Sequence, residues 1–505
     1  MEYIKRQIIF LFLRVARVLR DLLTRSENFY KLLFLPGYEA TRWRIGKWKA
    51  WFVFENTRRN TPAYKEFLAG REGCKVRMKG WDPDFSRIPL TDKESYIKKY
   101  TIESRCMNGR LPPAGVMIDE SSGTSGVPNN WVRGYEEREA VKHILQISLH
   151  HLLGTEPIFL INAFALGPWA TGMNVSLSLV DVTILKSTGP DISKIENTLN
   201  LFGPKYRYVI TGYPPFLKLL ADSRKVQWDQ YNVTVIFGGE GMSEEMREYL
   251  GRSFGKIYGS YGASDLEINI GAENDFTIAL RKLLLRNESL RNKVVHTKYG
   301  VFPMVFQYNP LDYYVETNEH GELVITLCRA SNIAPKIRYN IHDLGHVLRF
   351  PELKMILRAS GIRAREISKQ YSDLPLLLHY GRSDMAVAFY GCKITPQNIE
   401  EVIFSLPELA RVVSSFSLLI TEDNSANKKL SLAVELREGE KSNQLNKSKL
   451  RNEVLRKLAE INQDYREADH MIPQAHKPQL ELYDFSQGPF AVNDIRLKKH
   501  YIQRR

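Results

Sequence analysis

Strand-like and helical segments alternate through the middle of this 505-residue chain, and this alternation constrains the fold more than any other feature. Apolar, β-branched runs at 157–161, 208–210 and 233–237 are the predicted strands. The last of them leads through a glycine-rich turn into a helical segment at 243–254. Strands that alternate with helices predict an α/β core with largely parallel strands. Ligands of such sheets bind at the loops that leave the carboxyl ends of the strands.

The pattern changes after residue 380, where a smaller α+β unit is predicted. Its predicted elements are a strand over 387–394, a helix over 396–406, strands over 416–420 and 430–436, and a helix over about 447–467. We expect a large domain over 46–380, preceded by a basic helical lead over 1–45 and followed by a small domain over 381–505.

A basic N-terminal segment carries more than half of the net charge of +14, since residues 1–60 contain 13 Lys and Arg against 5 Asp and Glu. Arg14, Arg17 and Arg20 stand between apolar residues at helical spacing, which predicts an amphipathic helix. The unbroken apolar run at 8–13 is too short to span a bilayer. The helix either packs on the main domain or a partner, or lies on an anionic membrane surface through residues 1–30. No nucleic-acid-reading module is present, so nucleic acid is excluded as a partner.

Four scattered cysteines indicate a reducing, cytoplasmic location, which could be peripheral to the inner membrane face. They are Cys74, Cys106, Cys328 and Cys392, and none stands in a C-x-x-C pair or at ligand spacing from histidine. We interpret each as a small core residue.

A polar run, Ser121-Ser122-Gly123-Thr124-Ser125-Gly126, follows an apolar, strand-like segment at 114–118. Hydroxyl side chains donate hydrogen bonds to anionic oxygens, and glycines let backbone N–H groups approach a phosphate closely. The run lacks the G-x-x-x-x-G-K-[ST] pattern of a Walker A loop. A flexible polar linker is the alternative interpretation.

Three further motifs follow that run in order. They are Tyr261-Gly262-Ala263-Ser264-Asp265, Arg338-Tyr339-Asn340-Ile341-His342-Asp343 and Gly381-Arg382-Ser383-Asp384. With the run, they resemble the ordered motifs of the adenylate-forming superfamily of acyl-CoA synthetases and ligases. Segments 60–64 and 88–93 resemble the beginning of its phenylacetate–CoA ligase branch. The resemblance implies an α/β fold, in which a large N-terminal adenylate-forming domain with mixed, mostly parallel sheets is joined to a small mobile α+β C-terminal domain.

The resemblance also implies a role in ATP binding for each motif. Residues 121–126 would hold the pyrophosphate, Ser264 would donate to the α-phosphate, and Asp343 would accept from both ribose hydroxyls. Asp265 stands where the superfamily has glutamate and would bind Mg²⁺, with Glu267 as a weaker substitute. The other implied nucleotide-binding residues are Gly239, Glu240, Tyr261, Gly262 and Arg382, with Tyr261 stacked on adenine.

Aromatic residues in strand-end loops are the candidates for an acyl pocket. They are Phe164, Trp169, Tyr213 and Phe237. Such residues are more often plain core, but Gly167 and Gly172 flank Trp169 and favour a pocket for an aryl or medium acyl group.

The C-terminal region departs from the superfamily pattern. Asp384 matches the hinge about which the small domain rotates, although only one of the two usual aspartates is present. Lys498 and Lys499 are the late candidates for the catalytic lysine, and a simple basic tail is the alternative. The segment after Asp265 lacks the cysteines that bind zinc in some relatives, so we predict no zinc.

These inferences predict an ATP- and Mg²⁺-dependent ligase that adenylates a small carboxylic acid, releases pyrophosphate and transfers the acyl group to a thiol, with CoA as the expected acceptor. Two alternatives stay open. The acceptor could be an amine or a carrier protein in surface polysaccharide or secondary metabolite synthesis, or the chain could be a non-catalytic ATP-binding relative. The sequence leaves a homodimer open.

Overall fold

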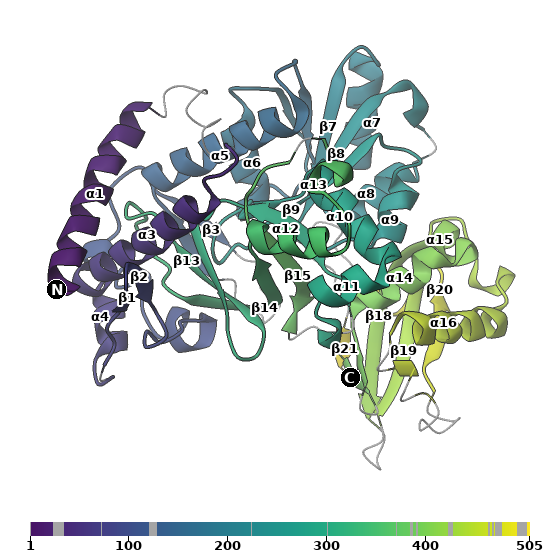
Figure 1. The fold of residues 1–505 in the computed structure, drawn as a ribbon. Coiled ribbons are helices and arrows are strands. Elements are labelled where there is room, and N and C mark those ends of the chain that lie inside the picture. The colour runs from purple at the N-terminus through teal and green to yellow at the C-terminus, as the bar shows by residue number, and fades with distance from the viewer. Residues whose placement is uncertain are drawn as a thin grey trace.

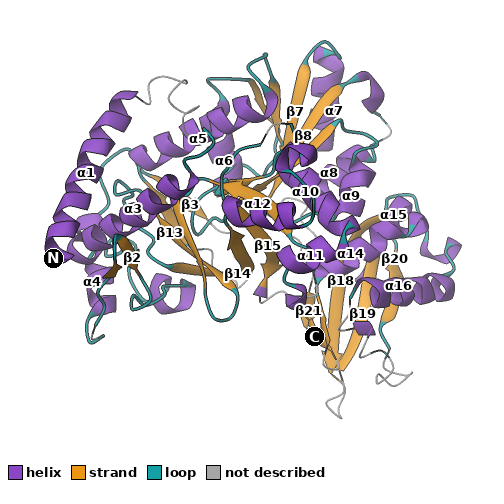
Figure 2. Ribbon diagram, in the orientation of Figure 1, coloured by secondary structure: helices purple, strands orange, loops and turns teal. Residues whose placement is uncertain are grey.

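The computed structural model describes residues 2–23, 35–71, 73–120, 129–223, 225–299, 301–369, 371–383, 387–389, 392–422, 428–462, 465–466, 469, 477–491 and 502–504. Its large part is built on an 11-stranded sheet (Figures 1 and 2). In spatial order the strands are β12 (Tyr313–Thr317), β13 (Glu322–Leu327), β14 (Tyr339–Leu348), β15 (Leu376–Arg382), β11 (Met304–Tyr308), β10 (Gly271–Ala272), β9 (Lys256–Tyr261), β8 (Asn232–Gly238), β7 (Arg207–Gly212), β5 (Phe159–Asn162) and β6 (Ile184–Ser187).

The sheet is parallel in one half and antiparallel in the other. Strands from β6 to β9 pair in parallel. Strands from β9 to β12 pair antiparallel. The predicted α/β class is confirmed, and the parallel half is the region where strands and helices alternate in the sequence.

Helices cover both faces of the parallel half. Their apolar side chains pack on alternate residues of the strands, as the two-residue period of a strand requires. On one face lie α5 (Tyr135–Leu153) and α6 (Ala170–Leu179). On the other lie α7 (Ile192–Phe202), α8 (Pro214–Ala221) and α9 (Glu244–Leu250). Beside the antiparallel half lie α10 (Asp275–Arg286), α11 (Glu288–Val294), α12 (Phe350–Ala359) and α13 (Ala364–Ile367).

The N-terminal part adds helices and two small hairpins to this core. They are α1 (Glu2–Leu23), α3 (Glu39–Asn60), α4 (Pro62–Leu68), β1 (Arg77–Lys79) with β2 (Asp82–Asp84), and β3 (Met117–Glu120) with β4 (Asn130–Arg133). Helix α3 runs through residue 45, where the helical lead was predicted to end, because its buried residues Trp51 and Phe54 belong to the main core. Among the described helices, none has an apolar stretch long enough to cross a bilayer.

A four-stranded sheet forms the core of the C-terminal part, in the order β20 (Gln479–Tyr483), β19 (Lys428–Leu436), β18 (Val413–Glu422) and β21 (Ile502–Arg504). Packed on it are α14 (Pro396–Ser405), α15 (Pro407–Val412) and α16 (Lys447–Ile461). Residues 387–394, predicted as one strand, instead form a hairpin of β16 (Val387–Phe389) and β17 (Cys392–Ile394). Single-turn 3₁₀ segments lie at Met107–Gly109, Trp228–Gln230, Thr297–Tyr299, Ser442–Gln444 and Gly488–Phe490, and a π-turn lies at Lys93–Ile97.

The C-terminal part contacts the large part around α8, α9 and α14, where the ring of Phe404 lies 5.6 Å from that of Tyr249 and polar contacts surround it. The backbone N–H of Ser243 donates to Glu400 Oε1 at 2.7 Å. Lys218 Nζ donates to the Val413 carbonyl at 2.5 Å, and Arg437 pairs with Asp222 at 2.5 Å.

Raising the pH is expected to weaken this interface. Burial raises the pKa of Glu400 to about 7 and the pKa of Glu401 to about 8, from 4.5, with Glu240 and Glu245 adding repulsion. In the folded protein these two carboxyls therefore keep their protons at pH values where they would be ionised in the unfolded chain. The free energy of unfolding falls as the pH rises from about 5 to about 8. Thermal unfolding across this range should show a falling midpoint, and Glu400→Gln with Glu401→Gln should flatten the fall. If the midpoint of the double variant falls equally, these two carboxyls do not cause the pH dependence.

Candidate active site

Asp343 lies at the centre of the candidate nucleotide site. Asp343 of β14 lies directly opposite Arg382 of β15, because the two strands pair antiparallel. The Tyr261 hydroxyl, at the end of β9, donates to Asp343 Oδ2 at 2.8 Å, and His379 Nε2 lies 3.3 Å from the same oxygen. Burial alone would raise the pKa of Asp343, but His379, Tyr261 and Arg382 outweigh it and hold that pKa below its usual value. The carboxylate is thus charged and partly preorganised as an acceptor.

Tyr261 joins this site to the core. Its ring stacks on Phe306 with centroids 5.6 Å apart and lies 4.9 Å from the His379 ring. Burial, reinforced by the charge of Asp343, raises the pKa of Tyr261 well above its usual range, so the hydroxyl stays a neutral donor. Adenine stacking on Tyr261 stays a prediction.

Asp265 stands on the loop after β9 as a partly exposed carboxylate. Its Oδ2 accepts a hydrogen bond from the Tyr339 hydroxyl at 2.8 Å and lies 3.8 Å from Lys93 Nζ, while Ser264 Oγ is 3.4 Å from its Oδ1. The described residues hold no cluster of three or more His, Cys, Asp or Glu that could bind a metal ion. A single carboxylate fits Mg²⁺, which takes its other ligands from phosphates and water.

Glu267 does not share this exposure. Its side chain is 1% exposed and is ion-paired with Arg329. The Tyr313 hydroxyl also donates to Glu267 Oε2, at 2.8 Å. A carboxylate held in a buried ion pair is not open to a second cation, so Asp265 alone fits the predicted metal role.

One buried guanidinium, that of Arg133, ties the Ser264–Asp265 loop to the β3–β4 hairpin. It donates to the Ser264 carbonyl at 2.5 Å and to the Leu266 carbonyl. It also pairs with Asp119 of β3 at 3.3 Å and with Glu137 of α5 at 3.1 Å. The predicted phosphate loop, residues 121–126, connects β3 to β4 and lies outside the described residues. Arg133 thus connects the β3–β4 hairpin to the segment that carries Ser264 and Asp265.

Lys336 is a buried cation of the site that the motifs missed. Its Nζ lies 4.8 Å from the Trp131 ring centroid and 5.8 Å from that of Tyr339. Burial, together with Arg133 and Arg105, lowers the pKa of Lys336 to about 7. Lys336 therefore lies against Trp131 of β4, and its charge changes with pH around neutrality.

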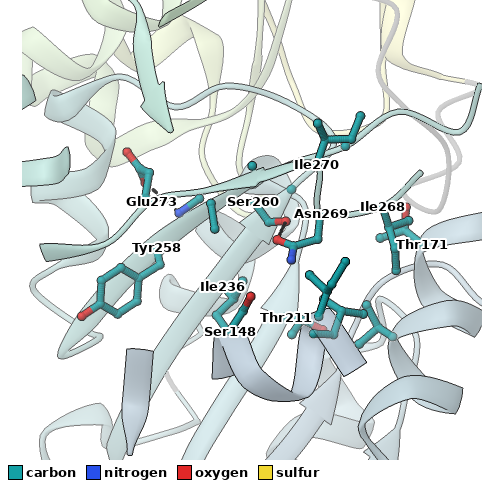
Figure 3. A pocket seen from close by; sticks show the side chains of 18 of the residues that line it. Ser148, Thr171, Thr211, Ile236, Tyr258, Ser260, Ile268, Asn269, Ile270 and Glu273 are labelled. Atoms are coloured by element: carbon teal, nitrogen blue, oxygen red, sulfur yellow. Dashed lines mark hydrogen bonds between the residues drawn. The ribbon is translucent and has the colours of Figure 1, made fainter. Parts of the chain in front are cut away.

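A cavity of about 250 Å³ opens beside these groups, between α5, α6 and the carboxyl ends of β7, β8 and β9 (Figure 3). Among its walls are Ser148 of α5, Thr171 of α6 and Ile236 of β8, and the loop over 268–270 closes one side. Gly238, Gly239, Gly262 and Ser264 also line it, so the cavity reaches the motif loops. Its walls are mainly apolar, which suits the hydrocarbon part of an acid.

Three of the four aromatic candidates line this cavity: Phe164, Trp169 and Tyr213. The rings of Phe164 and Tyr213 meet edge to face, with centroids 5.1 Å apart. Phe237 is buried on the opposite face of the sheet, under Arg247. Successive side chains of a strand point to opposite faces, so Ile236 takes the cavity side and Phe237 the core side. Glu240 is half-buried next to Gly239.

Replacing Gly172 with alanine is expected to disturb the cavity. A Cβ at this position would lie 2.1 Å from the Ala165 carbonyl oxygen, so helix α6 would have to move from the strand-end loop. Overpacking of this kind costs about 1–3 kcal/mol, which urea unfolding would measure. Gly241→Ala is the control, because its Cβ would meet only Met304 Cγ at 3.6 Å. Equal stability of the two variants would contradict the expectation.

Three further predicted residues, Asp384, Lys498 and Lys499, lie outside the described residues. The sheet places Arg382 in β15, so the large domain extends two residues past its predicted end at 380. Ser383 follows, and its hydroxyl donates to Glu322 Oε1 at 2.8 Å.

Solved structures with the same architecture reveal the fold family. The crystal structure of 2-hydroxyisobutyryl-CoA ligase in the postadenylation state, in complex with R3-HIB-AMP, matches with a TM-score of 0.63 and 13% identity, over 94% of this chain and 91% of that one. The chain has the fold of an adenylate-forming ligase. The same ligase with 2-HIB-AMP matches at a TM-score of 0.63 and 14% identity, over 92% of this chain and 89% of that one.

The crystal structure of that ligase in complex with 2-HIB-AMP and CoA, in the thioesterification state, matches this chain with a TM-score of 0.52 and 15% identity. The match covers 93% of this chain and 91% of that one. No protein-family model matches the sequence. No curated protein matches it either.

Proposed function

We propose that this protein is an ATP- and Mg²⁺-dependent acid ligase that forms an acyl-adenylate and transfers the acyl group to CoA. The observation that carries the proposal is the pairing of two groups along one segment. Tyr261 donates to Asp343, the register partner of Arg382, and three residues later Ser264, next to Asp265, lines an apolar cavity. The first group offers acceptors and charge for a ribose and phosphate, the second offers a donor and a metal ligand, and the cavity accommodates an acyl group.

The proposed reaction has two steps. A carboxylate oxygen of the acid attacks the α-phosphorus of ATP, and the bond to the leaving pyrophosphate breaks. The CoA sulfur then attacks the acyl carbonyl, the thiol proton is released, and AMP leaves with the electron pair of the C–O bond. Mg²⁺ at Asp265 would neutralise phosphate charge in the first step. Lys93 adds positive charge near the same carboxylate.

The cavity points to an aryl or medium acyl substrate, which is the class that the phenylacetate–CoA ligase branch would use. Its walls combine aromatic rings, Phe164 and Tyr213, with aliphatic side chains of α5. Burial raises the pKa of Tyr213 to about 12, so this residue contributes a neutral hydroxyl. Membership of that branch, a cytoplasmic location and a homodimer stay predictions.

Pyrophosphate release from ATP and Mg²⁺, measured across a panel of aryl, fatty and amino acids with hydroxylamine as trap, tests the first step. Acid-dependent release would establish adenylation and identify the substrate class. Ser148→Phe should then shift the preference towards smaller acids, and Ser148→Ala towards larger ones, because Ser148 lines the cavity. ATP binding without release for any acid would favour the non-catalytic alternative.

A second measurement identifies the acceptor. Replacing hydroxylamine by CoA should give an acyl-CoA thioester and free AMP in equal amounts. If the adenylate forms but CoA is not acylated, while an amine or a carrier protein is, the alternative acceptor is correct.

A further inference from the structure

Helix α1 has two apolar faces, and the protein covers only one of them. Ile9, Phe10 and Leu13 are buried. The Phe10 ring contacts Trp51 and Phe52 of α3, with centroids 5.1 Å and 5.0 Å apart. The basic helix was predicted either to pack on the main domain or to lie on a membrane surface, and this face of α1 packs on the main domain.

The opposite face of α1 is an exposed aliphatic stripe. It consists of Ile4, Ile8, Leu11, Val15 and Val18, whose exposed fractions lie between 52% and 63%. Their spacing of three and four residues places them in one line along about four turns of helix. Tyr3 and Phe12, both exposed, flank the stripe. Single exposed apolar residues are ordinary, but a contiguous line of this length marks an interaction surface.

The body of the protein holds α1 rigidly in this orientation. Arg17 pairs with Glu136 of α5 at 2.9 Å, and Lys5 Nζ donates to the Gly80 carbonyl at 3.0 Å. Lys5 also lies over the ring of Trp81, which is itself 46% exposed. In Figure 1 the helix lies along one edge of the molecule, with α3 between it and the sheet. A preformed, rigid face binds without the entropy cost of ordering a helix.

The charge of α1 distinguishes between two possible binding partners of the stripe, a second copy of the chain and a membrane surface. Residues 2–18 contain four basic side chains against a single acid, Glu2. Arg6 and Arg17 pair with Glu55 and Glu136 of the body, and the exposed Arg14 stands beside the stripe, three residues from Leu11. A second copy of the chain would bring an equally basic helix to the same face, and the two would repel each other. An anionic phospholipid surface complements the basic residues and accepts the aliphatic side chains.

We propose that α1 is an in-plane membrane anchor, which inserts the stripe Ile4, Ile8, Leu11, Val15 and Val18 into the surface of an anionic bilayer. The helix lies parallel to the membrane and does not cross it. The proposal does not depend on the proposed ligase activity, since none of these residues lines the cavity.

Co-sedimentation of the full chain with vesicles tests the proposal. The protein should bind mixed phosphatidylcholine–phosphatidylglycerol vesicles and bind pure phosphatidylcholine much more weakly. Leu11→Gln with Val15→Gln should lower the partition coefficient at least about tenfold, the equivalent of about 1.4 kcal/mol. Glutamine is a good helix former, so α1 itself should persist. Arg14→Gln should weaken binding about fivefold, the equivalent of about 1 kcal/mol for one basic residue at the surface.

The matched control is Leu201→Gln with Met355→Gln, which removes from other helices two apolar side chains that are at least as exposed. This control should bind vesicles like the unaltered protein. Equal binding by the stripe variant, or no preference for anionic vesicles, would overturn the proposal. So would a dimer, seen by light scattering, that the stripe variant dissociates, because a second copy would then be the occupant.

Discussion

Asp343→Asn is expected to lower kcat/KM for acid-dependent pyrophosphate release by about 10²- to 10³-fold. The change removes the charge that would accept both ribose hydroxyls, and hydrogen bonds to a charged acceptor contribute about 1.5–3 kcal/mol each. The side chain keeps its shape, and its amide oxygen can still accept from Tyr261, whose hydroxyl now lies 2.8 Å from Asp343 Oδ2. The loss should therefore appear in steady-state kinetics with little change in the thermal unfolding midpoint.

Tyr261→Phe is the matched control for that variant. It removes one neutral donor to Asp343 and keeps the ring that stacks on Phe306. We expect at most about a fivefold loss, in line with the contribution of one hydrogen bond. A loss as large as that of Asp343→Asn would show that Tyr261, rather than the carboxylate, is the group that binds the nucleotide. Full activity of Asp343→Asn would remove Asp343 from the site.

Asp265→Asn is expected to raise the Mg²⁺ concentration for half-maximal activity at least about tenfold and to lower the maximal rate about 10²-fold. A neutral amide oxygen is a weaker ligand for a hard divalent cation than a carboxylate. The variant also leaves Lys93, 3.8 Å away, without the opposite charge that it faces now. Titration of activity with Mg²⁺ at saturating ATP measures both quantities.

Glu267→Gln separates metal binding from stability. Glu267 is paired with Arg329 in the interior, and breaking a buried pair by removing one partner costs about 3–5 kcal/mol. This variant should unfold at lower temperature and keep the Mg²⁺ dependence of the unaltered protein. If instead its Mg²⁺ requirement rises and that of Asp265→Asn does not, the metal role belongs to Glu267.

The sequence predicted two central strands of the parallel half well, because both are continuous apolar runs that end at a glycine. The run at 233–237 became β8 (Asn232–Gly238), and the run at 208–210 became β7 (Arg207–Gly212). The hairpin of β16 and β17 was predicted as one strand, since the same apolar composition fits either one strand or two short paired strands.

Side chains that gather from distant segments were harder to predict than the motifs. Arg133, Lys336 and His379 lie outside every motif, and the structure alone brings them to the site. A partial clue existed for His379, which interrupts the apolar run of β15 and so had to find a polar partner in the interior. The assignment of Phe237 to the acyl pocket failed to use the alternation of β8, which gives the cavity side to Ile236.

The reach of Arg133 also has a consequence for how the protein folds. Its guanidinium binds the carbonyls of Ser264 and Leu266, which are 131 and 133 residues further along the chain. A ribosome adds about 5–20 residues per second, so roughly 7 to 27 seconds separate the synthesis of Arg133 from that of its acceptors. During that interval the guanidinium has only Asp119 and Glu137 as partners, and its contacts with the two carbonyls are absent. The site therefore forms late, as a long-range contact, after the parallel strands between its two halves have been made.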